Sequence, residues 1–193
     1  IKGGKLSRKE RGLESYKKCA DAIAKIAAKY PDQKGLILPY TDDIENGIVE
    51  AIKNNHPLVY ARLRQHSKIP KERDGVFREF EEEQNNEILI STYANQWFDG
   101  KMVDFTIIAK IPFGPLGDIQ VKAKAENDPK WYQTMTAIEL AQMAGRCVRS
   151  ESDVGHTYII DPSFMFHFER GMNNNPLARI LPAYISESII HNR

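Results

Sequence analysis

Three polar residues near the end of a predicted helix carry the strongest chemical signal in the sequence. Gln142, Arg146 and Arg149 are spaced i, i+4 and i+7, so on an α-helix their side chains project from one ridge. Arginine offers planar, permanently charged, bidentate donors that suit the charge on a transferring phosphoryl group. Gly145 beside them would let another surface approach closely. The pattern predicts a phosphate-binding ridge, and a solvated polar helix face is the alternative.

The elements that must position this ridge alternate between short apolar runs and amphipathic helices, which is typical of βα units. A helix is predicted from the capping-box spacing at 7–10 to Pro31, and a second helix begins near Thr41. Pro70 predicts the start of a further helix with an acidic, solvated outer face. The helix predicted over 131–148 should pack on a sheet through its apolar side. That side consists of Ala137, Leu140, Ala141, Ala144 and Val148.

Five apolar runs predict buried strands. Parallel strands need crossovers, and right-handed crossovers place helices on both faces, so we expect an α/β fold with a mostly parallel sheet of about five strands. Ligands of such sheets bind beyond the carboxyl ends of the strands. The predicted strands are 35–39, 58–60, 87–92, 105–109 and 156–161. The segments expected at their carboxyl ends are 39–42, 92–100, 112–118 and 161–164.

The composition is that of an ordinary globular domain. A length of 193 residues suits one domain, and 41% hydrophobic with 27% charged residues excludes collagen, coiled coils and wholesale disorder. The longest apolar runs are far shorter than the roughly 20 residues of a membrane helix, so no membrane partner is expected. Because the net charge is +1, any contact with nucleic acid must come from local placement of charge.

Residues that bind metals show no recognisable spacing. Cys19 and Cys147 alone cannot build a disulfide framework or a cysteine-based metal cluster. The histidines are scattered, so no metal site is predicted. The start of the chain at 1–4 has neither a methionine nor a signal region, which predicts an intracellular protein cut from a longer one, cytoplasmic or, if bacterial, nucleoid-associated. The histidines are His56, His66, His156, His167 and His191.

A longer pattern surrounds the arginine ridge. The run QMAGRCVR at 142–149, with Asp153, Gly155 and Asp161 after it, resembles motif VI and the following strand of superfamily 2 helicases of the XPD/DinG group. The resemblance covers nearly the whole chain and implies the RecA-like fold of the C-terminal half of a DNA helicase. Three earlier segments resemble that group's motif IV strand, its strand after motif V and the helix entering its second motor domain. They are 35–41, 107–113 and 7–16.

The resemblance implies catalytic roles for the ridge. Arg146 and Arg149 match the two arginines that reach the γ-phosphate of ATP held by the other RecA-like half, and Gln142 matches the glutamine that positions that phosphate or the attacking water. Gly145 would lie at the nucleotide. Asp99 matches the acidic residue near the ribose, although the sequence around it departs from the group because Trp97 replaces a glycine.

The resemblance also implies an interface for single-stranded DNA. Thr41, Thr92, Tyr93 and Asn95 lie at predicted strand ends, where their polar groups could hydrogen-bond DNA phosphates. Arg64 lies in the connection after the second predicted strand, where a DNA track could run. Ordinary solvated surface is the alternative for that arginine.

The sequence contains no Gly-x-x-x-x-Gly-Lys-Ser/Thr loop and no Asp-Glu-x-His run. ATP and Mg²⁺ would therefore be held mainly by an N-terminal RecA-like half, and the chain alone should not hydrolyse ATP. No iron–sulfur cluster is expected in this part of the protein. The alternative function is a non-catalytic RecA-like module that binds DNA or protein. The predicted organisation is an entry helix at 1–30, a core at 34–170 and a helical tail at 171–193.

Overall fold

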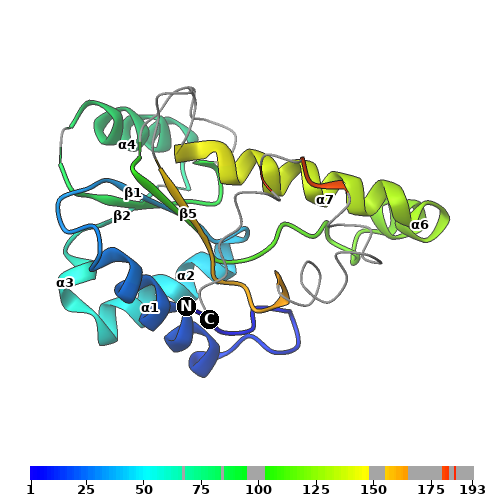
Figure 1. Cartoon of the computed structure of the whole chain (residues 1–193), viewed down its shortest axis with the longest axis horizontal. Helices are drawn as coiled ribbons and strands as arrows, with labels where there is room; N and C mark the ends of the chain where they lie inside the picture. The colour runs from blue at the N-terminus through cyan, green and yellow to red at the C-terminus, as the bar shows by residue number, and fades with distance from the viewer. Residues whose placement is uncertain are drawn as a thin grey trace.

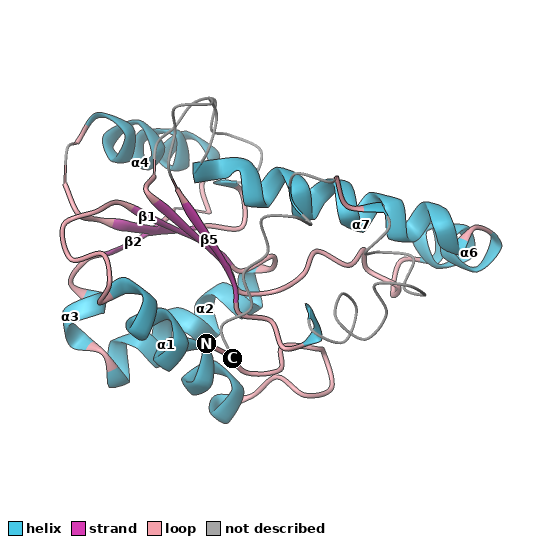
Figure 2. Ribbon diagram, viewed as in Figure 1, coloured by secondary structure: helices cyan, strands magenta, loops and turns pink. Residues whose placement is uncertain are grey.

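A five-stranded parallel sheet forms the centre of the molecule (Figures 1 and 2). The computed structural model describes residues 1–66, 68–83, 85–94, 103–147, 155–164, 180–182 and 185. The strand order is β2-β3-β1-β4-β5, and every pairing is parallel. The predicted RecA-like α/β fold is therefore confirmed. The strands are β1 (Gly35–Leu38), β2 (Leu63–Gln65), β3 (Ile88–Ile90), β4 (Phe105–Ile108) and β5 (His156–Ile159).

Helices cover both faces of this sheet, as parallel crossovers require (Figure 1). Helices α1 and α2 lie on one face, and α4 and α7 lie on the other. Helix α6 extends with the first part of α7 beyond the sheet as an arm, and none of its side chains is buried. The helices are α1 (Leu13–Ala27), α2 (Asp42–Asn55), α3 (Pro57–Tyr60), α4 (Pro70–Glu82), α6 (Ile119–Asn127) and α7 (Pro129–Ala144), followed by the 3-10 turn η1 (Gly145–Cys147).

Alternation along the strands divides the core in two. In β1, Ile37 faces the cluster under α1 and α2, while Leu36 and Leu38 face the cluster under α4 and α7. In β4, Phe105 and Ile107 join the first cluster. Both faces of the central strands are thus apolar, which explains why they read as continuous hydrophobic runs in the sequence.

Two predictions in the first third of the chain are wrong. The first helix begins at Leu13 and not at residues 7–10, because Ser7 begins a separate turn in which its carbonyl accepts from the N–H of Arg11 at 2.9 Å. The predicted strand at 58–60 is helix α3, which Pro57 starts. The strand β2 follows it instead. It is an edge strand with half-buried and exposed residues, so it lacks the apolar run of a central strand.

The long helix before β5 also differs from the prediction. Helix α7 starts at Pro129 because the Asp128 side chain caps it, accepting from Trp131 N at 2.9 Å. Asp118 caps the unpredicted helix α6 in the same way. The buried side of α7 is rotated from the predicted one, since Ala141 and Ala144 are only half-buried. The buried residues are Thr136, Ala137, Leu140 and Met143.

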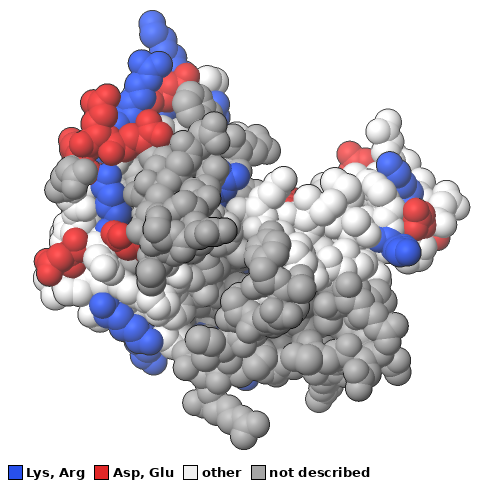
Figure 3. All heavy atoms as spheres, turned by 45° about the horizontal axis from the view of Figure 1, so that its top comes forward, with Lys and Arg blue, Asp and Glu red and all other residues white. Residues whose placement is uncertain are grey.

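Charged side chains of both signs mingle on the face drawn in Figure 3. Acidic and basic residues gather together at the upper left, where α4 lies, while the arm at the right carries charges at its far end. No helix among the described residues has the length and apolar character needed to cross a membrane. The predicted division into entry helix, core and tail stays a prediction, because most of 165–193 lies outside the described residues.

Candidate functional site

The carboxyl ends of the strands converge on one edge of the sheet, as predicted. The registers pair the last residues of β1, Ile37 and Leu38, with Ile90 of β3 and with Ile107 and Ile108 of β4. The segments after these strands therefore lie at the same edge. The edge collects the residues after β1, β2 and β3, and most of its polar side chains come from the start of α2 and from the turn after β3.

Tyr40, which the sequence does not single out, shapes the loop after β1. Its φ is +81°, in the left-handed region that residues other than glycine rarely adopt. The strained backbone is held in place because the Tyr40 hydroxyl donates to the Phe113 carbonyl at 2.9 Å. Burial raises the pKa of Tyr40 to about 12, so the hydroxyl stays a donor at neutral pH. This loop sets the entry of the chain into α2.

Thr41 occupies the N-cap position of α2, with extended backbone angles. Its carbonyl accepts the first helical hydrogen bond from Glu45 N at 2.9 Å, so the predicted place at the helix start is correct. The Thr41 hydroxyl forms no side-chain cap bond and its oxygen is buried without a hydrogen-bond partner among the described residues.

Thr92 and Tyr93 lie together in the turn after β3. Thr92 connects this turn to α2, since its N–H donates to Glu45 Oε2 at 3.1 Å and its hydroxyl donates to Asp42 Oδ1 at 2.9 Å. The Tyr93 ring is partly exposed, with the guanidinium carbon of Arg73 4.3 Å from its centroid. The Arg73 guanidinium thus forms a cation–π contact over the Tyr93 ring at this edge.

Arg64 forms ion pairs within the chain and is not a free surface arginine. It lies on β2, and its guanidinium contacts three carboxylates. Arg64 Nε lies 2.8 Å from Glu87, Nη1 lies 3.0 Å from Glu79 and Nη2 lies 3.5 Å from Glu83. Its charge is therefore largely compensated within the chain.

The arginine ridge lies at the C-terminal end of α7. Gln142 is exposed and Arg146 is half-buried in η1, so the helix changes to a 3-10 turn before Arg146. The turn rests on the first residues of β5, because Thr157 Oγ1 donates to the Ala144 carbonyl at 2.9 Å. A Cβ at Gly155 would meet the Cys147 carbonyl oxygen, so only glycine permits this close packing. The ridge and the polar carboxyl edge thus lie toward opposite ends of the strands.

Several predicted site residues lie outside the described residues. Arg149 follows the last described residue of η1, and Asn95 and Asp99 fall within 95–102. Their roles stay predictions. Asp161, matched within the motif, is described and buried. Its carboxylate accepts from Ile111 N and Ser163 N, both at 2.9 Å, and so joins the segments that follow β4 and β5.

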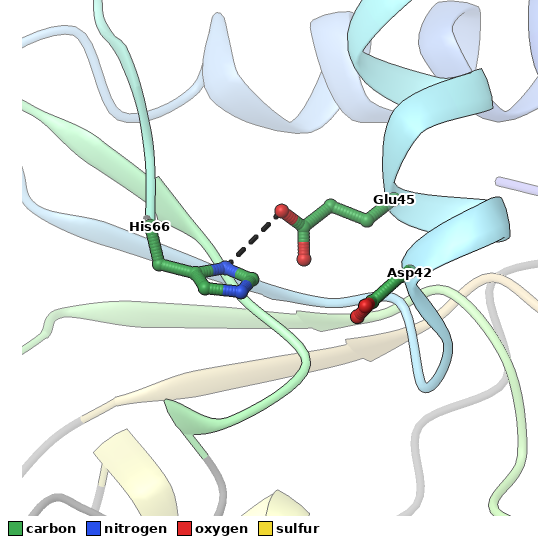
Figure 4. A group of neighbouring side chains, drawn as sticks. All are labelled: Asp42, Glu45 and His66. Atoms are coloured by element: carbon green, nitrogen blue, oxygen red, sulfur yellow. Dashed lines mark ion pairs between the residues drawn. The ribbon is translucent and has the colours of Figure 1, made fainter. Parts of the chain in front are cut away.

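A group of possible metal ligands, which the sequence analysis did not predict, lies at the carboxyl edge (Figure 4). One ligand atom from each of Asp42, Glu45 and His66 lies within 4.8 Å of the others. Asp42 and Glu45 belong to the first turn of α2, whereas His66 follows β2. No local spacing joins the histidine to the two carboxylates, so sequence patterns alone could not identify the group.

Glu139 of α7 provides a pH-dependent test of how this helix packs. Burial raises its carboxyl pKa above the ordinary 4.5, so the folded state binds its proton more tightly than the unfolded state. Stability from this group is therefore present at low pH and is lost as the pH rises through the raised pKa. We expect Glu139→Gln to match the wild type at pH 4 and to be more stable at pH 7, measured by urea unfolding. A wild-type advantage at pH 7 would contradict the prediction.

Comparisons with known proteins agree with this geometry. The profile of the family described as helicase C-terminal domain matches residues 14–175. An apo structure of XPD aligns with a TM-score of 0.62 at 16% identity, covering 83% of this chain and 34% of XPD. The structure of S. tokodaii Xpd4 aligns with a TM-score of 0.52 at 15% identity, and the alignment covers 80% of this chain and 33% of Xpd4.

A third solved structure, the C-terminal domain of the DEAD-box protein Dbp5, aligns with a TM-score of 0.51 at 14% identity. It covers 86% of this chain and 79% of that domain. The chain thus spans about a third of the length of the two XPD structures. No curated protein matches this chain in sequence.

At these identities the structures establish the fold, and the profile establishes the family. The chain belongs to the family of helicase C-terminal domains, as its resemblance to the XPD/DinG group predicted.

Proposed function

We propose that the chain is the C-terminal motor half of an ATP-dependent DNA helicase. The observation that carries the proposal is the position of Gln142, Gly145 and Arg146 at the end of α7, in a domain of the helicase C-terminal family. In this proposal an N-terminal RecA-like half binds ATP and Mg²⁺, and closure of the two halves brings the ridge to the γ-phosphate.

The chemistry of the ridge follows from its side chains. Arg146, with Arg149 after it, donates hydrogen bonds to the charge that builds up on the γ-phosphoryl oxygens in the transition state. Gln142, exposed one turn earlier, orients the phosphate or the attacking water. These contacts form only when a nucleotide reaches the ridge, so the chain alone is expected to be inactive.

The DNA interface in this proposal is the carboxyl edge of the sheet. Tyr93 supplies a partly exposed ring for contacts with a base, and the Arg73 guanidinium, which lies over that ring, supplies positive charge. Thr92 is left out of the phosphate contacts, because its N–H donates to Glu45, its hydroxyl donates to Asp42 and both carboxylates would repel a phosphate. Arg64 is left out of this interface because three carboxylates surround it.

Gly145 gives the sharpest test of the proposed closure. Its φ of −76° suits any residue, and a Cβ there would meet no atom of the described residues within 4 Å, so the described part of the chain does not require glycine. We expect Gly145→Ala to leave the thermal unfolding midpoint of the chain unchanged. In the full-length protein it should lower DNA-stimulated ATP hydrolysis at least about tenfold, because a misplacement of about 1 Å can cost far more.

The matched control is Gly117→Ala, since a Cβ at this second glycine likewise meets no atom within 4 Å in the part of the chain that the structure describes. It should change neither stability nor ATP hydrolysis. If Gly145→Ala retained full ATPase activity, no second lobe would approach the ridge. That result would favour the alternative of a non-catalytic module that binds DNA or protein.

A further inference from the structure

Three side chains with metal-binding atoms meet at the carboxyl edge, away from the arginine ridge (Figure 4). Asp42 and Glu45 project from the first turn of α2, and His66 approaches them from the end of β2. The side chains of Glu45 and His66 are each 2% exposed. A buried carboxylate is costly unless a cation or several hydrogen bonds compensate it.

His66 has polar atoms that the rest of the described chain does not use. Neither ring nitrogen forms a hydrogen bond with a described residue, although Nδ1 lies 3.1 Å from Glu45 Oε1 without hydrogen-bond geometry. Among the described aromatic rings, Tyr93 lies against the imidazole in a T-shaped arrangement, with the ring centroids 5.1 Å apart. Buried imidazole nitrogens almost always have a partner. A ligand between the imidazole and the carboxylates would supply one.

Hydrogen bonds from Gln65 and Thr92 orient the two carboxylates. Glu45 accepts from Gln65 Nε2 at 2.9 Å and from Thr92 N at 3.1 Å. Asp42 accepts from the Thr92 hydroxyl through Oδ1. Outer hydrogen bonds of this kind fix the orientation of metal ligands in known sites.

We propose that Asp42, Glu45 and His66 bind one divalent cation of the zinc class. Imidazole nitrogen suits Zn²⁺ and similar transition metals, whereas Mg²⁺ and Ca²⁺ prefer all-oxygen sites. Three protein ligands with the fourth position open to water is a common zinc arrangement. The cation would also neutralise the charge of the two carboxylates.

The geometry requires only a small adjustment. Ligand atoms about 2.1 Å from a tetrahedral zinc ion lie roughly 3.4 Å from one another, close to the 3.1 Å between Glu45 and His66. The widest separation in the group, at most 4.8 Å, must shorten by no more than roughly 1.4 Å. Asp42 is half-buried and can supply this movement by side-chain rotation, while the buried pair stays in place.

The test titrates the 193-residue chain with Zn²⁺ alone, in excess Mg²⁺, by calorimetry and thermal unfolding. We expect one saturable Zn²⁺ per chain and a midpoint raised by about 5–10 °C when free Zn²⁺ reaches about 100 times its dissociation constant. Asp42→Asn keeps an acceptor for Thr92 but removes the charge, and should weaken Zn²⁺ binding at least about tenfold. His66→Asn should do the same and should abolish the visible spectrum of bound Co²⁺.

The matched control is His56→Asn. Among the described residues, His56 forms a second histidine–carboxylate pair, with Nε2 2.8 Å from Asp21 Oδ1, and the loss of this pair should leave Zn²⁺ affinity unchanged. If His66→Asn fails to fold, Asp42→Asn on the half-buried side decides the outcome. Unchanged affinity in Asp42→Asn, or no saturable Zn²⁺ binding by the wild type, would overturn the proposal and leave a hydrogen-bonded polar cluster. The test involves no nucleotide, so its result is independent of the proposed helicase function.

Discussion

Replacing Arg146 with alanine in the full-length protein is expected to lower DNA-stimulated ATP hydrolysis by a factor of about 10³ to 10⁵. The expectation rests on the proposed function. The guanidinium would stabilise charge that develops on the γ-phosphoryl group, in a closed site where water cannot replace it. Steady-state phosphate release with and without single-stranded DNA measures the effect.

Two controls separate this role from damage to the fold. Arg146→Lys keeps the charge but loses the bidentate fork, so most of the loss should remain. Arg78→Ala removes an exposed arginine of α4 and should leave the ATPase rate unchanged. Binding of single-stranded DNA should persist in Arg146→Ala, because the ridge lies toward the opposite ends of the strands from Tyr93. Undiminished ATP hydrolysis in Arg146→Ala would reject the catalytic role.

A second large effect is expected in the core, where Gly35 of β1 pairs with Phe105 of β4. The Phe105 ring is fully buried and stacks on Tyr30 with centroids 4.6 Å apart. A Cβ at Gly35 would lie within 2.8 Å of three of its ring carbons. The ring has little room to move, because it is fully buried and stacks on Tyr30. We expect Gly35→Ala to destabilise the chain by about 1–3 kcal/mol and Phe105→Ala by about 3–5 kcal/mol.

The double variant makes the argument specific. In Gly35→Ala with Phe105→Ala the new methyl group enters the space that the ring has left, so the total loss should be smaller than the sum of the single losses by about 0.5–3 kcal/mol. Urea unfolding monitored by circular dichroism measures all three. Gly75→Ala is the matched control. This glycine lies inside α4, and an added Cβ would meet no described atom within 4 Å, so the change should be neutral or stabilising. Strict additivity of the two core changes would show that Gly35 and Phe105 are not in contact.

The fold was largely predictable where both faces of an element are buried. The apolar runs of β1, β3 and β4 read as parallel strands because neither side of these strands meets water. Prediction failed at β2, whose half-exposed residues carry no such signal, and at 58–60, where Pro57 and the preceding turn favour a helix. The caps Asp118 and Asp128 were visible signals for the starts of α6 and α7.

The candidate site was predictable only in its local parts. The motif at 142–149 is continuous in sequence, so it could be recognised there. The joint projection of Gln142, Arg146 and Arg149 stays a prediction, because α7 ends at Ala144 and Arg146 lies in the 3-10 turn η1. The conformation of Tyr40 was not predictable in this way, because its left-handed backbone depends on a hydrogen bond to Phe113, far away along the chain. The ion pairs of Arg64 were not predictable either, since its three acidic partners come from α4, from the C-cap of α4 and from the residue before β3.

The amino-acid sequence by itself therefore determined the parallel α/β architecture and the family, because both depend on short-range periodicity and on one contiguous motif. Only the tertiary structure decided that Asp42, Glu45 and His66 share one polar centre. It also decided that carboxylates compensate the charge of Arg64, and that the ridge lies away from the carboxyl edge. The physical reason is that parallel pairing brings the ends of distant strands together. Which side chains meet there depends on register and helix packing, and no local pattern records either.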